Sequence, residues 1–414
     1  MPRREAVIEE EHRQSLLVLL AGHIFQLAAY AAALYHLAFT TTTPQPYHTS
    51  GLSGQAWVDE LRNGHEDRIA CELGVRKHIF NILLAELRWL GVEGSRYVSL
   101  EEKLGIFLYT CTTALPVRHI GERFQRSNET ISHYFREVLD AFTEPDFYNR
   151  YVCLPDANAP IPAYILKNPK LYPFFKDAIG TADGTHICCW PSKEERELAR
   201  DRKGQISHNC LVCCSFDMRV QYAVTGYDGA SADATMYAQS RLADLHIPEG
   251  KYYIADAGFG TCDNLLVPYR GVRYHLNEWQ RGHLRPNNRE ELFNLRHAQA
   301  RNIVERIFGV LKAKWGVLIR PVRYSMDIQV KIPLALMAIH NLIMEYDPVE
   351  SLAAIQDPIE DFYDPAADPE AGGDLAISMI VSEEEIQRSL HRRDEIAQAM
   401  WDSYLVELQE RENL

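Results

Sequence analysis

Two short apolar segments, each carrying an aspartate beside a glycine, place the strongest constraint on the fold of this chain of 414 residues. The first is Ile179–Ile187, which contains Asp183, and the second is Tyr252–Phe259, which contains Asp256. Short apolar runs bounded by turn residues are typical of buried β-strands. A third acid, Glu305, lies in a helical pattern rich in arginine. Because these acids are far apart in the sequence, only a folded α/β core brings them together.

From residue 179 onward the hydrophobic pattern changes from helical spacing to short apolar runs, which predicts a mixed α/β sheet. The expected strands are 179–188, 209–217, 220–227, 252–256 and 272–277, with a short helix at 233–242 and a long helix beginning near Asn287 or Asn288. This order of elements is like that of ribonuclease-H-like nucleases. In the long helix, Glu305 falls on the same line as Arg301 and Lys312.

A helical region precedes the sheet. Apolar residues recur at helical spacing from Trp57 to Phe142, and the part from 116 to 135 has the form of a helix-turn-helix. Ser127 or Asn128 is placed to cap the second helix. The side chains expected to face DNA are Arg126, Glu129, Thr130, His133 and Arg136. An ordinary helical hairpin with a solvated polar face has the same spacing, so that alternative stays open.

A long segment near the N-terminus, Leu16–Phe39, contains 24 residues without Asp, Glu, Lys or Arg. This length is sufficient to span a bilayer. The polar side chains of His23, Gln26 and His36 favour instead a helix that is buried or that associates with itself. Membrane association stays open as the alternative.

The net charge of −14 is distributed unevenly along the chain. Residues 350–414 hold 17 acids against four arginines and account for nearly all of it, whereas residues 281–331 hold 11 basic residues against four acids. A basic segment therefore surrounds Glu305, which is compatible with a nucleic-acid substrate.

Nine cysteines without disulfide-like spacing are typical of a chain in a reducing compartment. The pair Cys210 and Cys213 has the spacing of half a zinc site, but no second pair of suitable spacing accompanies it. Buried strand cysteines are the favoured interpretation.

These patterns divide the chain into five regions. We expect an apolar helix with a linker (1–54), a helical domain with the helix-turn-helix (55–145), a proline-rich connector (146–178), the α/β domain (179–348) and an acidic tail with a terminal helix (349–414).

The three acids suggest metal-dependent chemistry. If the strands carrying Asp183 and Asp256 are neighbours, about 4.8 Å apart, their side chains can share a cation, and a helix packed over them can add Glu305. Three carboxylates form an oxygen shell that favours Mg²⁺, with Mn²⁺ as a substitute, and two such ions can polarise a phosphodiester. Taken singly, each acid has an ordinary structural interpretation, as a turn aspartate or a salt-bridged helix glutamate.

Several separated blocks of sequence carry a family resemblance. They are Glu122–Phe124, Ser127–Tyr134, Phe174–Gly180, Asp183–His186, Arg202–Gly204, Ser207–Asn209, Ile254–Phe259, Pro268–His275, Leu292–His297, Asn302–Lys312 and Ala338–Asn341. With these blocks in this order, the chain resembles the PIF/Harbinger-type DDE transposases and their domesticated relatives.

The resemblance implies roles for individual residues. Asp183, Asp256 and Glu305 would form the metal-binding DDE triad on a ribonuclease-H-like fold, holding two Mg²⁺ or Mn²⁺ ions. Asp233 would support the site, and His186 would orient Asp183 or contact DNA, unless it is an ordinary strand histidine. The further candidates for contacts to DNA phosphates are Arg202, Lys203, Arg301, Arg306 and Lys312.

The resemblance also implies a nuclear endonuclease that cuts double-stranded DNA at element ends and joins the 3′ hydroxyls to target DNA. Such a protein would act as a homo-oligomer, with a Myb-like DNA-binding protein as a further partner. A domesticated, catalytically silent DNA-binding or scaffold protein is the alternative. Three features depart from the family pattern: the apolar helix, Thr181-Ala182 before the first acid, and the acidic tail.

Overall fold

The computed structural model describes residues 2–40, 45–197, 199–201, 204–273, 285–347, 349 and 380–412. Contacts divide the chain into two units, Met1–Ser50 and Gly51–Leu414. The first unit contains one long helix, α1 (Pro2–Thr40), whose side chains from residue 7 to residue 39 are all exposed. By length and composition the segment Val7–Phe39 is able to cross a membrane. The segment Met326–Tyr346 passes the same test, but it is mostly buried and is a core helix of the second unit.

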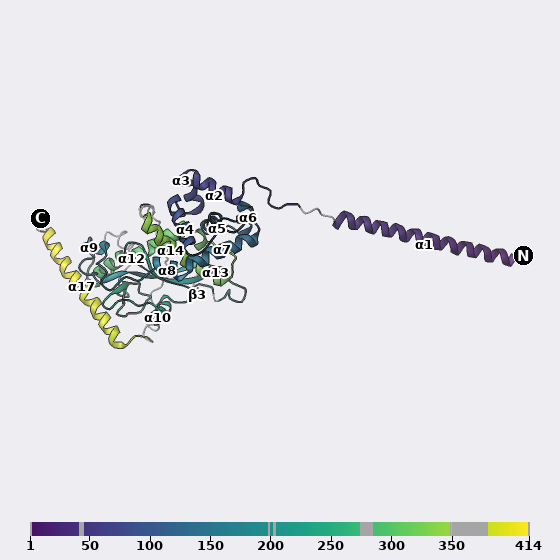
Figure 1. Ribbon diagram of the computed structural model, residues 1–414. Helices are drawn as coiled ribbons and strands as arrows, with labels where there is room; N and C mark the ends of the chain where they lie inside the picture. The colour runs from purple at the N-terminus through teal and green to yellow at the C-terminus, as the bar shows by residue number, and fades with distance from the viewer. Residues whose placement is uncertain are drawn as a thin grey trace. The chain divides into compact units, whose positions relative to one another are not determined.

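The second unit begins with a group of helices, coloured blue in Figure 1. They are α2 (Gly54–Asn63), α3 (Glu66–Leu73), α4 (Lys77–Trp89), α5 (Leu100–Thr113), α6 (Val117–Phe124), α7 (Asn128–Thr143), α8 (Pro145–Tyr151) and α9 (Ala163–Leu166). Three residues separate α6 from α7, and Ser127 caps α7 by accepting a hydrogen bond from the backbone N–H of Thr130. The predicted pair of helices and its cap are therefore present.

A five-stranded mixed sheet follows in the order β3-β2-β1-β4-β5. The strands are β1 (Ala178–Cys188), β2 (Ser207–Cys214), β3 (Val220–Asp228), β4 (Tyr252–Ile254) and β5 (Leu265–Leu266). The pairs β1–β2 and β2–β3 are antiparallel, while β4 and β5 run parallel to β1. The mixed α/β sheet is thus confirmed.

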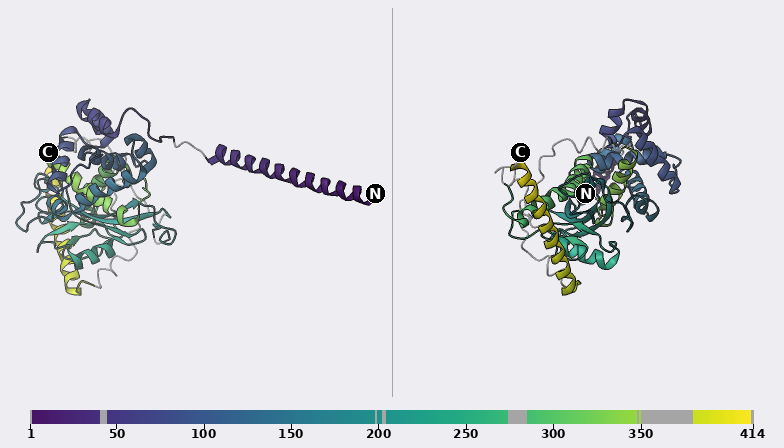
Figure 2. Two further views of the ribbon diagram at one scale, coloured as in Figure 1. Left: turned by 45° about the vertical axis from the view of Figure 1, so that its right-hand side comes forward. Right: turned by 90° about the vertical axis from the view of Figure 1, so that its left-hand side faces the viewer.

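Helices cover both faces of the sheet (Figure 2). They are α10 (Asp233–Ala243), α12 (Arg289–Lys314), the 3-10 helix η1 (Gly316–Leu318), α13 (Met326–Gln329) and α14 (Lys331–Tyr346). One core lies between the sheet, α12, α14 and the N-terminal helices, and a smaller core lies under α10. The N-terminal helices and the sheet therefore share one hydrophobic core.

The fifth strand differs from the sequence prediction. Residues 271–273 form a turn and not a strand, and 274–277 lie outside the described residues. The Asn294 side chain on α12 holds this segment, since it accepts from the N–H of Tyr269 and donates to the carbonyls of Tyr269 and Val272. Backbone groups satisfied in this way are not available for a sheet ladder, and Leu265–Leu266 pairs with β4 instead.

The start of α12 is as predicted, because Asn288 caps it and accepts from the N–H of Glu291 at 2.8 Å. The cysteines of β2 are buried, also as predicted. Cys210 faces the larger core and Cys213 the smaller one, because side chains alternate along a strand. This places the two thiols on opposite faces of the sheet.

The C-terminal helix α17 (Glu383–Glu412) folds back onto the body and packs against α12 (Figure 1). Glu385 forms an ion pair with Arg241 at 2.9 Å, and Ser389 donates to the carbonyl of Cys262. Ala397 and Met400 are fully buried. The acidic tail thus ends in a helix that covers one edge of the sheet.

Candidate active site

The two aspartates come from matching positions on neighbouring parallel strands. Thr181 of β1 pairs with Ile254 of β4, and each acid lies two residues further along its chain. Because side chains alternate with a period of two, Asp183 and Asp256 emerge on the same side of the sheet. The register of this single strand pair therefore brings together two acids that are far apart in the sequence.

The third acid comes from α12, which packs over β1. Arg301 and Glu305 lie one turn apart on this helix, and their side chains form an ion pair at 2.7 Å. The same guanidinium approaches Asp183 at 2.6 Å and Asp256 at 3.8 Å. Three acidic side chains thus converge on one positively charged side chain, that of Arg301.

Each aspartate uses its two oxygens differently. The Oδ1 atom of Asp183 accepts from the N–H of Gly184 at 3.0 Å, and the Oδ1 atom of Asp256 accepts from the N–H of Gly258 at 2.8 Å. The Oδ2 atoms of both aspartates are directed to the same nitrogen, Nη2 of Arg301. The backbone therefore orients the two carboxylates so that one oxygen of each faces a common cation.

The site holds more negative charge than one guanidinium neutralises. Burial is the main cause that raises the pKa of Asp183 to about 8. Arg301 lowers this pKa, whereas the charges of Asp256, Asp233 and Glu305 raise it. The negative charge around the buried Asp183 is therefore only partly compensated by Arg301.

The donor set fits divalent cations of the Mg²⁺ class, because it consists of carboxylate oxygens only. Among the described residues, no group of three or more His, Cys, Asp or Glu side chains is already arranged around a metal position. Arg301 lies between the acids, so the guanidinium has to move before metal ions bind to the three carboxylates.

Asp233 and His186 lie on the other side of the sheet from the acids. Asp233 starts α10 and packs against Gly184, where a Cβ atom would lie only 2.1 Å from its Oδ1. Asn209 of β2 donates to the same oxygen. Asp233 thus supports the backbone directly after Asp183, and Gly184 is required for this close approach.

His186 is exposed, and its Nδ1 lies 3.2 Å from the hydroxyl of Ser207. Its side chain emerges on the face opposite to Asp183, because the two residues are three positions apart on one strand. The structure therefore places His186 next to Ser207 and not next to the acid that it was expected to orient.

The basic residues predicted near the acids have different surroundings. Arg301 is the counter-ion of the triad, and Lys312 donates to the hydroxyl of Thr185, two residues beyond Asp183 on β1. Arg306 is partly buried on the same helix. Arg202 and Lys203 lie outside the described residues.

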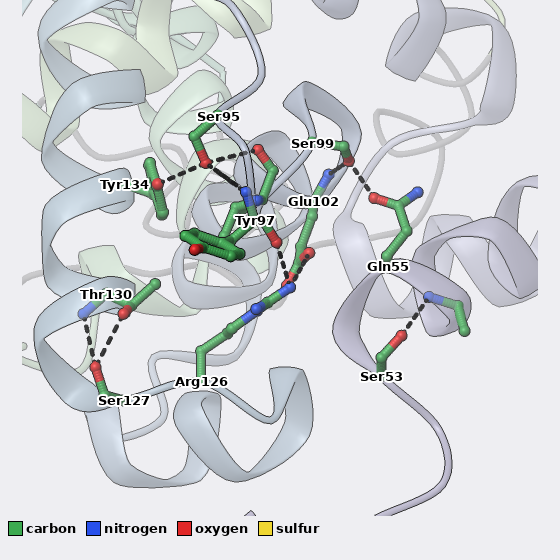
Figure 3. A network of polar contacts seen from close by, with 12 residues as sticks. Ser53, Gln55, Ser95, Tyr97, Ser99, Glu102, Arg126, Ser127, Thr130 and Tyr134 are labelled. Carbon is green, nitrogen blue, oxygen red and sulfur yellow. Dashed lines mark hydrogen bonds and ion pairs between the residues drawn. The ribbon is translucent and has the colours of Figure 1, made fainter.

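The residues predicted to face DNA divide into two groups. Glu129, His133 and Arg136 are exposed on α7, and Thr130 is partly exposed. Arg126, in contrast, is bound within the protein: it donates to both carboxylate oxygens of Glu102, at 2.9 and 3.0 Å, and to the carbonyl of Tyr97 (Figure 3).

Sequence reasoning missed the contacts of two residues at the site. Arg301 was expected to contact DNA, although its spacing of four from Glu305 is the usual signal of a helix ion pair. Asn209 was noted only as part of a motif, and no sequence signal points to its contact with Asp233, because that contact arises from the packing of α10 on β2.

Two family models match the chain. Residues 182–341 match the DDE superfamily endonuclease family, and residues 49–144 match a domain of unknown function. The first match begins one residue before Asp183 and includes Asp256 and Glu305. The second corresponds to the N-terminal helices.

The chain is also similar to HARBI1 proteins, which are named as candidate nucleases. Identity to the protein of Rattus norvegicus is 23% over 44% of this chain and 50% of that protein. Identity to the protein of Bos taurus is 22% over 64% of this chain and 73% of that protein. Identity to the protein of Homo sapiens is 22% over 61% of this chain and 69% of that protein. No solved structure matches the chain.

Proposed function

We propose that this chain, whose residues 182–341 form a DDE superfamily endonuclease domain, is a metal-dependent DNA nuclease and strand transferase. The observation that carries the proposal is the convergence of Asp183, Asp256 and Glu305 on one guanidinium. Two carboxylates with their Oδ2 atoms directed to a common point, and a third from a helix above them, are suited to hold cations against a phosphodiester.

The fold supports this proposal. The strand order 3-2-1-4-5, with three antiparallel strands followed by two parallel ones, corresponds to the ribonuclease-H-like fold that the resemblance implies. In this arrangement Asp183 lies on the central strand β1 and Asp256 follows its neighbour β4. We therefore assign the α/β part of the chain to this fold.

The proposed reaction has two steps. In the first, water attacks a phosphorus atom at the element end, the bond from phosphorus to the 3′ oxygen breaks, and that oxygen takes up a proton. In the second, the new 3′ hydroxyl attacks a phosphodiester of target DNA and loses its proton, and the target strand leaves with a 3′ hydroxyl. Two divalent cations, Mg²⁺ or Mn²⁺, would supply activation of the nucleophile and stabilisation of the leaving oxygen. The chain itself would contribute the three carboxylates, two of which, Asp183 and Asp256, are oriented by the N–H groups of Gly184 and Gly258.

Double-stranded DNA is the proposed substrate, with α6 and α7 as a helix-turn-helix that binds it. The three-residue turn and the exposed side chains of Glu129, His133 and Arg136 support this part of the proposal. We further propose that the protein acts in the nucleus as a homo-oligomer, since two element ends are cut together, and that a Myb-like protein assists DNA binding.

The test is a cleavage assay on duplex DNA that carries a terminal repeat. We expect pure wild-type protein to nick this DNA with Mg²⁺ or Mn²⁺ but not with EDTA, and Asp256→Ala to lose at least a hundredfold in rate. The matched control is Asp67→Ala, because Asp67 is a surface acid with a 91% exposed side chain. No metal-dependent nicking by the wild type would reject the enzyme in favour of a catalytically silent DNA-binding protein.

A further inference from the structure

A tryptophan lies at the far end of the strand that carries Asp183. Trp190 follows the end of β1 by two residues, and 45% of its surface is exposed. From Asp183 to the end of the strand at Cys188 the chain extends by about 16 Å. Trp190 is therefore outside the acid site but lies on the same structural element.

The backbone of Trp190 is held firmly. The buried side chain of Gln329 accepts from the N–H of Trp190 at 2.8 Å and donates to its carbonyl at 3.1 Å. Both polar groups of this one residue are thus satisfied by one amide side chain. Such a double contact fixes the backbone from which the indole projects and leaves the ring uncovered.

The ring has positively charged neighbours. The guanidinium of Arg323 lies 4.8 Å from the ring centroid and that of Arg196 lies 5.9 Å from it. Among the described residues neither Arg196 nor Arg323 forms an ion pair with an acidic side chain within 4.0 Å, although Glu195 and Glu197 flank Arg196 in the sequence. Both guanidinium groups can therefore contact a phosphate.

Another exposed tryptophan shows the difference. Trp89 has 59% of its surface exposed, and the guanidinium of Arg150 lies 4.1 Å from its ring. Arg150, however, forms an ion pair with Glu86 at 2.7 Å. The charge beside Trp89 is neutralised within the protein, whereas the charges beside Trp190 are not.

Contacts also connect Trp190 to the proposed DNA-binding helix. Gln329 donates to the carbonyl of Tyr324, and the ring of Tyr324 stacks on Phe135 of α7 at 4.8 Å. A chain of contacts through Gln329, Tyr324 and Phe135 thus joins Trp190, at the end of the strand of Asp183, to α7.

We propose that Trp190 stacks on an unpaired base of the DNA substrate while Arg196 and Arg323 contact the adjoining phosphates. An exposed aromatic ring beside unpaired arginines is the usual platform for a single-stranded base. Inside a duplex the faces of a base are covered by its neighbours, so only an unpaired or extruded base can use this platform. The proposal rests on the DNA nuclease function above and deepens it: the substrate is DNA with an unpaired base outside the acid site, beyond the end of the strand that carries Asp183.

The experiment compares binding of the full chain to two labelled duplexes, one blunt and one with three unpaired bases at one end, by fluorescence anisotropy in EDTA. Loss of a stacked aromatic side chain weakens nucleic-acid binding by about 5- to 150-fold. We expect the wild type to bind the duplex with unpaired bases about tenfold more tightly than the blunt one. Trp190→Ala should abolish this preference with unchanged affinity for the blunt duplex, and Trp190→Phe should keep most of it.

Trp89→Ala is the matched control and should behave like the wild type. An unchanged preference in Trp190→Ala, or an equal loss of affinity for both duplexes, overturns the proposal. So does a wild type that binds both duplexes equally. A preference that depends on Trp190 in a protein that does not cut DNA with Mg²⁺ would support the stacking site and reject the nuclease. Cleavage of DNA by a wild type that lacks this preference would support the nuclease and reject the stacking site.

Discussion

At the scale of single residues, the acid site combines groups that repel one another. Asp183 is buried beside Asp256 and Glu305, and the guanidinium of Arg301 contacts all three. Removal of carboxylates from water is costly unless counter-charges compensate for it. The clustering of these acids therefore costs the chain stability, which is typical of functional sites.

Mg²⁺ should stabilise the folded protein. A ligand that binds only the folded state at a hundredfold excess over its dissociation constant adds about 2.7 kcal/mol, or roughly 5 °C in Tm for a chain of this size. We expect a shift of this order for the wild type and for the surface variant Asp67→Asn, and less than about 1 °C for Asp256→Asn. Differential scanning fluorimetry with and without 10 mM Mg²⁺ measures it. Equal shifts in all three proteins would contradict metal binding at the acids.

The sequence was sufficient to predict the three acids because each interrupts an apolar or helical pattern. Their convergence depends on the register of Thr181 with Ile254, which local patterns do not specify. The position of Arg301 between the acids depends on the packing of α12 over β1, which local spacing does not fix either. Local signals thus identified the acids but not their counter-ion.

At the scale of elements, two ion pairs orient α7. Arg126, just before the helix, binds the buried Glu102 of α5, and Glu137 within the helix binds Lys103 of α5 at 2.8 Å. The helix that is proposed to meet DNA is therefore fixed to the core from its inner side, and its outer side chains are left exposed.

Arg126→Ala should destabilise the protein by about 3 kcal/mol, because it leaves the buried carboxylate of Glu102 without its partner. The matched variant is Arg136→Ala on the exposed side of α7, which should change stability by less than about 0.5 kcal/mol. Urea denaturation measures the free energy of unfolding of both variants. The prediction fails if Arg126→Ala costs no more stability than Arg136→Ala.

For Arg136→Ala we also expect weaker DNA binding. The slope of the logarithm of the binding constant against the logarithm of the salt concentration should fall in magnitude by about one.

The helix α1 should mediate self-association. Its leucines, including Leu20, Leu27 and Leu34, recur at intervals of seven and are exposed in the first unit. An apolar surface of this size requires a partner in water. We expect the full chain to form a larger oligomer than residues 51–414 in light scattering, and Leu27→Lys to reduce it. If the full chain co-sediments with phosphatidylcholine vesicles while residues 51–414 do not, α1 is a membrane helix instead.

At the scale of the whole molecule, the N-terminal helices and the five-stranded sheet are joined by buried polar contacts. The side chain of Asn341 on α14 accepts from the N–H of Val220 and donates to the carbonyls of Val220 and Tyr151. Its neighbour His340 donates to the carbonyl of Met218. The sequence patterns predicted two domains with a connector between them. They gave no sign of these contacts, because the paired residues are more than a hundred positions apart and leave no local signal.

Buried histidines should make the fold sensitive to acid. Burial lowers the pKa of His208 and His340 to about 4 and that of His297 to about 3. The unfolded chain binds these protons near pH 6.5 and the folded chain does not, so their effect is to reduce stability as the pH falls from 6.5 toward 4. The raised pKa of Asp183 acts in the opposite sense over the range from 8 downward.

A substitution separates these effects. His340→Gln retains a donor for the carbonyl of Met218 but removes one titrating group. We expect the variant to be less stable than the wild type at pH 7.5 and the difference to shrink by about 2 kcal/mol at pH 5.0, where one buried histidine costs about that amount. Urea denaturation at the two pH values measures it. A difference that does not change with pH would contradict a neutral buried His340.

The position of Arg301 among the acids also bears on the order of two events, the folding of the chain and the binding of metal ions. Many small metal-binding domains fold only when the ion arrives, because their ligands repel one another without it. Here Arg301 is attached to α12 and reaches Asp183, Asp256 and Glu305 as soon as that helix packs on the sheet. We therefore expect the chain to complete its fold in the absence of metal ions. In the proposed nuclease the ions would bind after folding, and the side chain of Arg301 would leave the acids as they bind.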